Sequence, residues 1–276
     1  MKRFFLTIFV VLCLFLLFII GNDVIRTHQI TENLDTSPIA PFVQPSKSIQ
    51  LSQDWQTLSS GVEVRSLQYA YNGQSYQIQV IRLDPNQGTL SLQYDQRGKT
   101  VSQWAKGTDH LVVSNAGFFK EKNEPVGLLY VNGERLDSHR VKPADSGLLV
   151  IHENGIEILN LANAPIPAEL QNAVQTYPVL IDQGKLIANK NMTKQDRRTA
   201  IGTDRDRRIY LFTAGYQHLG LYDFAKVISE SGLQLTEVLN LDGGGSTGVA
   251  VDAGTFQKII ESETAVPTVL VFSERK

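Results

Sequence analysis

The stretch LNLDGGGSTGVAV, Leu239–Val251, decides how this chain folds, because three consecutive glycines interrupt a strand pattern directly after an acidic residue. Glycine weakens strand interiors, and within a strand it marks a bulge, a tight turn or a close approach to the backbone. A glycine run taken alone favours the bulge or turn. The alternative is an anion-binding concavity, in which the N–H groups of residues 243–245 lie beside the carboxylate of Asp242.

The sequence around this stretch is rich in strand and hairpin signals. Asn-Gly pairs at 72–73, 132–133 and 154–155 separate apolar or alternating segments, and Asp182-Gln183-Gly184 does the same, which is typical of β-hairpins. Further strands are predicted over residues 237–241, 247–251 and 266–272.

Two segments have helical periodicity instead. Residues 101–106 form a short candidate, and residues 221–231 place Leu221, Phe224 and Ile228 near one face before Gly232 ends the helix. We therefore predict an α+β fold with a strand-rich mixed or antiparallel sheet and a few packed helices. It forms a single domain after an N-terminal membrane segment.

The N-terminus has the pattern of a membrane segment. Lys2 and Arg3 precede an apolar run over residues 4–20 that lacks charge, Pro and Gly, and about 17 residues suffice to span a bilayer. No small-x-small cleavage site follows, so residues 1–21 are predicted to be a signal anchor in preference to a removed signal peptide. The positive-inside rule places the rest of the chain outside the cytoplasm. We expect an extracytoplasmic, membrane-anchored protein, secreted if the segment is cleaved.

Composition indicates how the rest of the chain is organised and which partners it lacks. Residues 22–58 are polar and contain three prolines, which predicts a linker, and residues 59–276 form the predicted domain. The only cysteine, Cys13, lies in the apolar run, so no disulfide supports the domain. A formal net charge of -2 gives no broad basic surface, and we expect no nucleic-acid partner.

Several polar residues adjoin predicted strands. An arginine at a strand start is usually solvated, but Arg198 leads directly into Thr199 and an apolar strand, where a guanidinium can bind phosphate bidentately. Asn115 ends an apolar strand before Gly117, and an asparagine alone more often caps a turn than binds substrate. Phe118 and Phe119 are more typical of a core than of a sugar platform.

Metal ligation is not indicated by the sequence. The five histidines are scattered, and no His or carboxylate cluster has metal-ligand spacing. Asp204 and Asp206 resemble a solvated turn more than a calcium site. We expect no required cofactor, and no divalent cation is indicated.

The stretches described above, taken in order, resemble the phosphodiester glycosidase family. The resemblance covers roughly residues 62–272 and is specific as a combination of short pieces. Those pieces are Asn115–Phe119 (NAGFF), Gly127–Leu128, Tyr177–Leu180 (YPVL), Arg198–Gly202 (RTAIG) and Leu241–Thr247 (LDGGGST). Tyr177 departs from the family pattern, since many relatives carry glycine before the proline, and substrate preference is not carried over there.

The resemblance implies an extracytoplasmic hydrolase that cleaves the glycosidic bond of a sugar-1-phosphodiester to give free sugar and a phosphomonoester. Its substrate would be a sugar-phosphate-containing small molecule or glycopolymer. Asp242 is the first candidate for the carboxylate at the anomeric carbon, and Asp204 is the second. Arg198 and the N–H groups of Gly243, Gly244, Gly245 and Ser246 would clamp the phosphate.

The same resemblance implies that Asn115 holds sugar hydroxyls or the phosphate. The remaining predicted substrate-binding residues are Gly117, Phe119, Gly127 and Thr199. The competing hypothesis is a membrane-tethered, non-catalytic binder of anionic envelope polysaccharide. Such a binder would keep the arginine and the glycines but would need no positioned carboxylate, and Asp242 would then be salt-bridged away from the glycine loop.

Overall fold

The structure is a computed structural model that describes residues 48–275 apart from 52–53, 60, 72–73 and 138–145. The predicted membrane segment, residues 4–20, lies outside the described residues, as does most of the predicted linker. Across the part of the chain that is described, no helix is long and apolar enough to cross a membrane.

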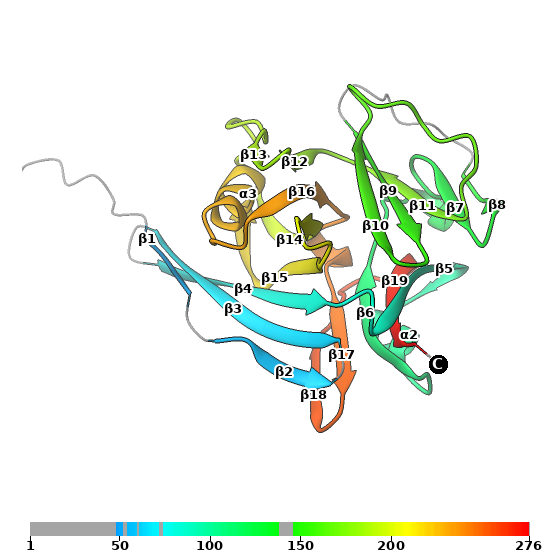
Figure 1. Ribbon diagram of the computed structural model, residues 1–276, viewed down its shortest axis with the longest axis horizontal. Helices are drawn as coiled ribbons and strands as arrows, with labels where there is room; N and C mark the ends of the chain where they lie inside the picture. Colours follow the sequence, from blue (N-terminus) through cyan, green and yellow to red (C-terminus); the bar gives the residue numbers. More distant parts are fainter. Residues whose placement is uncertain (1–47, 52–53, 60, 72–73, 138–145, 276) are drawn as a thin grey trace, which may run out of the picture. The chain divides into compact units, whose positions relative to one another are not determined.

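The largest sheet has nine strands in the order β1-β3-β4-β15-β14-β16-β12-β13, with β2 paired to β3 (Figure 1). The strands are β1 (Ser48–Leu51), β2 (Gln56–Ser59), β3 (Val62–Tyr71), β4 (Gln74–Leu83), β12 (Val179–Asp182), β13 (Lys185–Leu186), β14 (Gln195–Asp204), β15 (Ile209–Gly220) and β16 (Leu235–Asn240).

Two five-stranded sheets complete the fold. The first has the order β18-β17-β6-β19-β5 and comprises β5 (Gly88–Lys99), β6 (His110–Asn115), β17 (Val249–Ala253), β18 (Phe256–Ile260) and β19 (Val266–Glu274). The second has the order β10-β9-β11-β7-β8 and comprises β7 (Leu129–Val131), β8 (Glu134–Arg135), β9 (Gly147–His152), β10 (Gly155–Asn160) and β11 (Asn172–Thr176).

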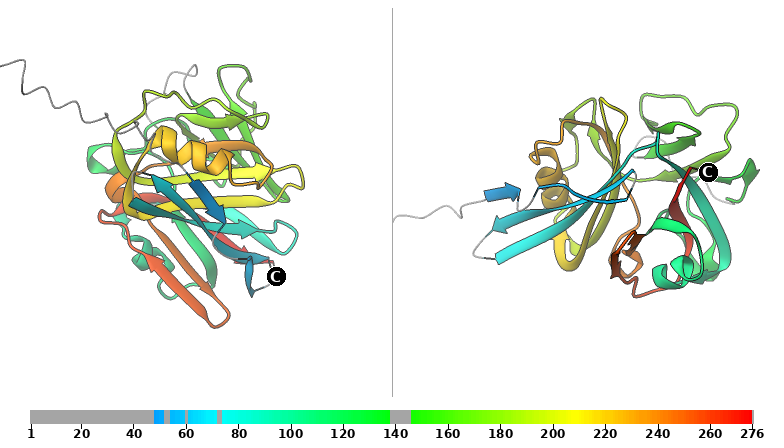
Figure 2. Two further views of the ribbon diagram at one scale, coloured as in Figure 1. Left: turned by 90° about the vertical axis from the view of Figure 1, so that its left-hand side faces the viewer. Right: turned by 60° about the horizontal axis from the view of Figure 1, so that its bottom comes forward.

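Helical elements are short and few among the described residues. They are α2 (Val101–Ala105), α3 (Leu221–Ser229), and the 3-10 turns η1 (Glu121–Asn123) and η3 (Gly244–Ser246). Helix α2 begins with a capping box, in which the Thr100 hydroxyl accepts from the Gln103 N–H and the Gln103 side chain returns to the Thr100 N–H. Helix α3 lies across the nine-stranded sheet (Figure 2).

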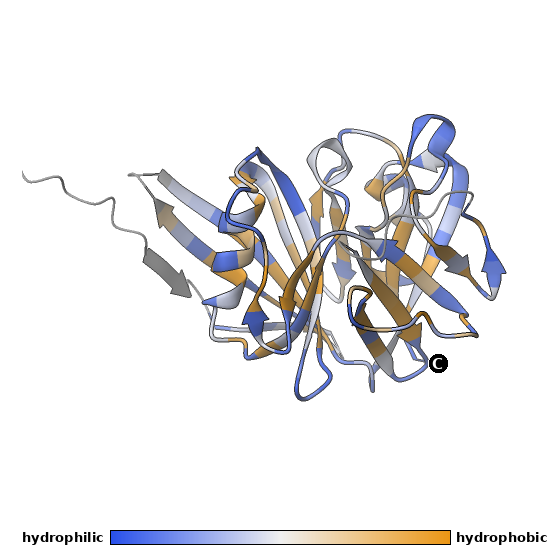
Figure 3. Cartoon of the chain, turned by 90° about the horizontal axis from the view of Figure 1, so that it is seen from above, coloured by the Kyte–Doolittle hydropathy of each residue, from blue (hydrophilic) through white to orange (hydrophobic). Residues whose placement is uncertain are grey.

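One core lies among the three sheets. It contains Ile201 and Leu239 from the nine-stranded sheet, Val249 and Leu270 from the β6–β17 sheet, and Leu149 from β9. Figure 3 shows the apolar residues concentrated on the strands, whereas the connecting loops are mostly hydrophilic. A second core joins the other face of the nine-stranded sheet to α3. The strands between these cores are therefore buried on both faces.

Most sequence predictions of local structure are confirmed. Every pairing between described strands is antiparallel, so the sheets are not mixed. Both predicted helices are present, and α3 ends at Ser229, two residues before the predicted end. The Asn-Gly pairs at 132–133 and 154–155 lie at the β7–β8 and β9–β10 turns, and Asn132 has the positive φ that such turns require.

The predicted linker differs from the structure at its C-terminal end. Residues 48–51 and 56–59 form β1 and β2, which pair with β3. Trp55, between them, has the guanidinium of Arg82 4.1 Å and that of Arg65 4.9 Å from its ring centroid. Polar composition concealed these strands because a strand at a sheet edge needs few apolar residues.

The opening stretch now has a structural explanation. Strand β16 belongs to the nine-stranded sheet, and β17 belongs to the β6 sheet. The residues between them, 241–248, therefore carry the chain from one sheet to another. The glycines lie at a crossing between sheets, where two further strand ends meet them.

Candidate active site

The candidate site forms where strand ends from two sheets meet. Leu241 donates its N–H to the Thr199 carbonyl oxygen at 2.9 Å, which ties the crossing to β14. Asp242 donates its N–H to the Ala116 carbonyl oxygen, also at 2.9 Å, which ties it to the end of β6. The chain around Asp242 is thus held between β14 and the residue that follows β6.

Asn115 is the central support of this junction. Its side chain is fully buried, and Nδ2 donates to the Asp242 carbonyl oxygen at 2.7 Å. Its Oδ1 accepts from the Thr199 hydroxyl at 3.0 Å and from the Gly248 N–H at 3.1 Å. The Thr199 hydroxyl also lies 3.4 Å from that of Thr247. These bonds occupy Asn115 and Thr199 inside the chain and fix the backbone of Asp242.

Close packing explains the triglycine. A Cβ on Gly243 would lie 2.8 Å from the Arg197 carbonyl oxygen, a contact that backbone cannot relieve. Gly244 has a φ of +60°, and a Cβ there would lie 3.2 Å from the Asp196 carboxylate. A Cβ on Gly245 would lie 3.2 Å from the Thr264 methyl group. Part of the close approach predicted at these glycines is therefore made by the chain itself.

The loop still leaves backbone donors for a ligand. The Gly243 N–H bonds the Asp242 carboxylate at 2.9 Å, and the Ser246 N–H bonds the Gly243 carbonyl oxygen. No described residue accepts from the N–H groups of Gly244 and Gly245. Two of the four predicted N–H groups are thus available, in a turn where Gly244 is left-handed, and such turns bind anions.

The Asp242 carboxylate is partly buried and lacks a cationic partner among the described residues. Burial and, to a smaller extent, the nearby Asp196 carboxylate raise the pKa of Asp242 to about 6. The Ser246 hydroxyl and the Gly243 N–H act in the opposite direction by stabilising the charged form. A carboxyl group with this pKa exchanges its proton near neutral pH, as acid–base or nucleophilic groups do.

Asp196 is a site residue that sequence reasoning missed. Its carboxylate packs against Gly244, accepts from the Arg197 N–H at 3.1 Å and pairs with Lys194 at 3.4 Å. Strand alternation did not reveal it, because a bulge in the β14–β15 register lies between Asp196 and Arg198. In the folded chain its charge nevertheless acts on the Arg198 guanidinium.

Arg198 is held by backbone oxygens at the edge of the glycine loop. Its Nε donates to the Leu219 carbonyl oxygen at 2.9 Å, and Nη2 donates to that of Lys194. Its Nη1 lies 3.9 Å from the position of a Cβ on Gly243. Burial lowers the pKa of Arg198, opposed by the charge of Asp196. The guanidinium is thus fixed, with one end free to meet a ligand.

The neighbouring arginine has a different environment. Arg197 is buried, donates from Nη2 to the Glu261 carbonyl oxygen at 2.8 Å and pairs with Glu263 at 3.1 Å. Because neighbouring residues of a strand project to opposite faces, the two arginines have different partners. Arg197 holds the loop after β18, and Arg198 meets the glycines.

Three other predicted substrate-binding residues, Gly117, Gly127 and Phe119, make packing contacts within the chain. A Cβ on Gly117 would lie 2.7 Å from Val174, and one on Gly127, which has a φ of +90°, would lie 2.9 Å from the Gln175 carbonyl oxygen. Both glycines therefore pack against β11. Phe119 bridges Pro125 and packs against the apolar cluster beneath α2.

Strand β11 leads into an aromatic pair beside the site. The Tyr177 ring is 40% exposed and stacks on Phe118 with a centroid distance of 4.7 Å. The Tyr177 carbonyl oxygen accepts from the Asn240 side chain at 2.8 Å, two residues before Asp242.

Asp204, the second candidate carboxylate, is not part of this constellation. It lies at the opposite end of β14, about 20 Å from Arg198 at the usual rise of a strand. Its carboxylate accepts from Arg208 Nε and the Tyr210 hydroxyl, both at 2.7 Å, and from the N–H groups of Asp206 and Arg208. The described residues contain no group of three His, Cys, Asp or Glu side chains suited to a metal ion.

Comparison with known proteins identifies the family. A model of the phosphodiester glycosidase family matches residues 108–273, more than half of the chain. This chain belongs to the phosphodiester glycosidase family. The matched residues include Asn115, Arg198 and Asp242. No curated protein sequence matches the chain significantly.

Solved structures share the fold at low identity. The catalytic domain of zebrafish N-acetylglucosamine-1-phosphodiester alpha-N-acetylglucosaminidase, auto-inhibited by pro-peptide, aligns with a TM-score of 0.59 at 15% identity, covering 83% of this chain and 89% of that one. A hypothetical protein from Synechocystis gives a TM-score of 0.55 at 17% identity and coverages of 84% and 68%. A Burkholderia pseudomallei protein assigned as exported gives 0.53 at 13% identity and coverages of 86% and 98%.

Proposed function

We propose that this phosphodiester glycosidase hydrolyses the bond between the anomeric carbon of a sugar and the phosphate oxygen of a sugar-1-phosphodiester. The products are free sugar and a phosphomonoester. The observation that carries the proposal is the convergence of one poised carboxylate, Asp242, with two available N–H groups and the fixed guanidinium of Arg198.

Charge on the leaving group sets what this reaction needs. The departing phosphate already carries negative charge, so neutralising that charge matters more than protonating the oxygen. Arg198 Nη1 and the N–H groups of Gly244 and Gly245 supply donors for this purpose. Because Leu219 and Lys194 hold the guanidinium through their carbonyl oxygens, little reorganisation accompanies the reaction.

Asp242 serves the anomeric carbon. Above about pH 6 its carboxylate is ionised and faces a carbon that develops oxocarbenium character, which it attacks or towards which it directs water. Asp196 is a positioning residue that acts on the charge of Asp242. Asn115 and Thr199, expected to contact substrate, are assigned a positioning role because their polar atoms bond within the chain.

The binder hypothesis has less support. It required an Asp242 salt-bridged away from the glycine loop, whereas its carboxylate accepts from the Gly243 N–H and has no ion pair with any described residue. We further propose that the enzyme acts outside the cytoplasm, tethered through residues 4–20 or secreted after cleavage. The N-terminal sequence supports this location.

Hydrolysis in ¹⁸O-labelled water tests the reaction directly. The full-length protein is incubated with a panel of sugar-1-phosphodiesters, and free reducing sugar is measured. Cleavage of the C–O bond places the label on the anomeric carbon of the sugar, which is the expected result. Label on phosphate would identify a P–O phosphodiesterase instead, and binding without any product would favour the polysaccharide binder. NMR of the first-formed anomer then distinguishes attack by Asp242 from attack by water.

A further inference from the structure

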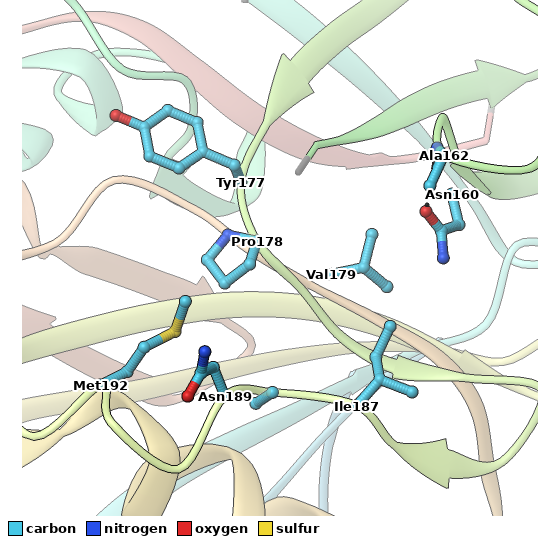
Figure 4. A pocket seen from close by; sticks show the side chains of 9 residues that line it. Asn160, Ala162, Tyr177, Pro178, Val179, Ile187, Asn189 and Met192 are labelled. Carbon is cyan, nitrogen blue, oxygen red and sulfur yellow. Dashed lines mark hydrogen bonds between the residues drawn. The ribbon is translucent and has the colours of Figure 1, made fainter. Parts of the chain in front are cut away.

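A pocket of about 370 Å³ lies at the start of β12, the strand that pairs with β16 just before Asp242, and the roles assigned above do not use it. Its lining residues carry no charged side chain. They are Asn160, Ala162, Tyr177, Pro178, Val179, Ile187, Ala188, Asn189 and Met192, and Figure 4 shows their arrangement. An uncharged lining of this size suits a neutral organic group better than a phosphate.

Two connections join this pocket to the catalytic groups. The Pro178 carbonyl oxygen accepts from the Asn240 N–H at 3.1 Å, and Asn240 lies two residues before Asp242. Met192 lies two residues before Lys194, whose carbonyl oxygen holds the Arg198 guanidinium. The pocket and the phosphate clamp are therefore built on the same short segments.

Hydrogen bonds fix which polar atoms face a ligand. Asn189 Oδ1 accepts from the Asn191 N–H at 2.9 Å, so its Nδ2 is the atom left for another partner. Asn160 Oδ1 accepts from the Ala162 N–H at 3.2 Å, and its Nδ2 donates to Asp182 at 2.9 Å with one hydrogen remaining. The pocket thus offers amide donors beside apolar carbon, which suits a ligand with oxygen acceptors on an apolar body.

We propose that this pocket is a subsite for the aglycone, the uncharged alcohol portion on the far side of the phosphate from the scissile sugar. The assignment rests on the proposed function. Amide donors of Asn189 and Asn160 meet the oxygens of the aglycone, and Pro178, Val179 and Ile187 meet its carbon surface. A pyranoside or polyol with several oxygens fits this chemistry, whereas an aglycone that carries a second charge does not.

The position of Tyr177 separates the two ends of the substrate. Figure 4 shows its ring directed away from the other lining side chains, and this ring stacks on Phe118. Phe118 lies two residues after Ala116, whose carbonyl oxygen accepts a hydrogen bond from the Asp242 N–H. The ring therefore packs on the segment that holds the Asp242 backbone, whereas the other lining side chains lie on the opposite side of the Tyr177–Pro178 segment.

A pair of substrates that differ only in the aglycone tests the subsite. One is the glucose-1-phosphodiester of methanol, and the other is that of the 6-hydroxyl of methyl glucopyranoside. Ile187, 47% exposed, is changed to Asp, and Asn189 is changed to Ala. Each variant should lose about 10-fold in kcat/KM with the glucopyranoside diester and little with the methyl diester. The matched control is Ile259→Asp at a similarly exposed isoleucine on β18, 52% exposed, which should affect neither substrate.

Equal losses with both substrates would overturn the subsite, and so would a loss that followed changes in the sugar but not in the aglycone. Calorimetry separates this failure from failure of the proposed function. Methyl glucopyranoside 6-phosphate and methyl phosphate are titrated into the full-length wild-type protein and into the Asn189→Ala variant. Tighter binding of the glucopyranoside that is lost in the variant supports the pocket even if no diester is hydrolysed. Equal binding of both phosphates by the wild type would rule the pocket out.

Discussion

The two ends of strand β14 present opposite solutions to burying an aspartate. At one end, the Asp204 carboxylate has four donors, including the Arg208 guanidinium and the Tyr210 hydroxyl. At the other end, Asp242 approaches the strand with only a hydroxyl and one N–H group, and a second carboxylate lies nearby. In the first arrangement the carboxylate is fully hydrogen-bonded within a turn. In the second, burial and a neighbouring carboxylate disfavour the charged form of Asp242. That difference, and not burial alone, marks the reactive end of the strand.

The largest expected difference in activity is between substitutions of Asp242 and of Asp204. Asp242→Asn removes the carboxylate that the Gly243 N–H holds at the glycine loop, and sugar release should fall by about 10³- to 10⁴-fold. Asp204→Asn is the matched control and should keep full activity per folded molecule. The measurement is kcat/KM for reducing-sugar release, with circular dichroism as the check on folding. An active Asp242→Asn enzyme would remove Asp242 from the mechanism.

The arginines at the two ends provide the next contrast. Arg198→Ala should lower kcat/KM for phosphodiesters by about 10²- to 10³-fold, because the charge that faces the phosphate is lost. Arg198→Lys should not restore it, since an ammonium cannot bond both Leu219 and Lys194 and still reach the loop. Arg208→Ala, at the Asp204 end, should leave kcat/KM unchanged. If Arg198→Ala weakened binding of uncharged sugars as much as that of phosphodiesters, the clamp would be wrong.

The sequence predicted the strand-rich fold and both helices, and the family resemblance named Asn115, Arg198 and Asp242 as site residues. Turn dipeptides and periodicity are local signals, so they located the elements but did not show how distant segments meet. Asp196 was missed because nothing local distinguishes it from a solvated strand residue. Asp204 was chosen as the second candidate carboxylate because its donors, Arg208 and Tyr210, become its partners only in the folded turn. The internal roles of Asn115 and of Gly243 likewise depend on contacts between distant segments.

Stability should respond in opposite directions at the two ends. The folded-state pKa of Asp242 is raised to about 6 from an ordinary value of 3.8, so the native state loses stability as pH rises through this window. Asp242→Asn should therefore raise the free energy of unfolding by about 2–3 kcal/mol at pH 8, with the gain vanishing below pH 4. Asp204→Ala should lower it by about 2 kcal/mol at pH 8, because Tyr210 and two N–H groups lose their acceptor. Urea unfolding at both pH values measures these changes. A pH-independent gain for Asp242→Asn would contradict the raised pKa.

The smallest expected effect isolates Asp196. Its charge raises the pKa of Asp242, so Asp196→Asn should move the acidic limb of the pH profile of kcat/KM to lower pH, by less than about one unit. Activity requires ionised Asp242, and the wild-type limb is therefore expected near pH 6. Lys194→Ala is the matched variant, because it leaves the Asp196 charge without its ion pair while the main-chain oxygen that holds Arg198 stays in place. The acidic limb of the Lys194→Ala variant should stay at the wild-type pH or move to higher pH. A merely structural role for Asp196 would lower kcat/KM at every pH without moving the limb, whereas opposite displacements in the two variants would show that the pair sets the charge of Asp242.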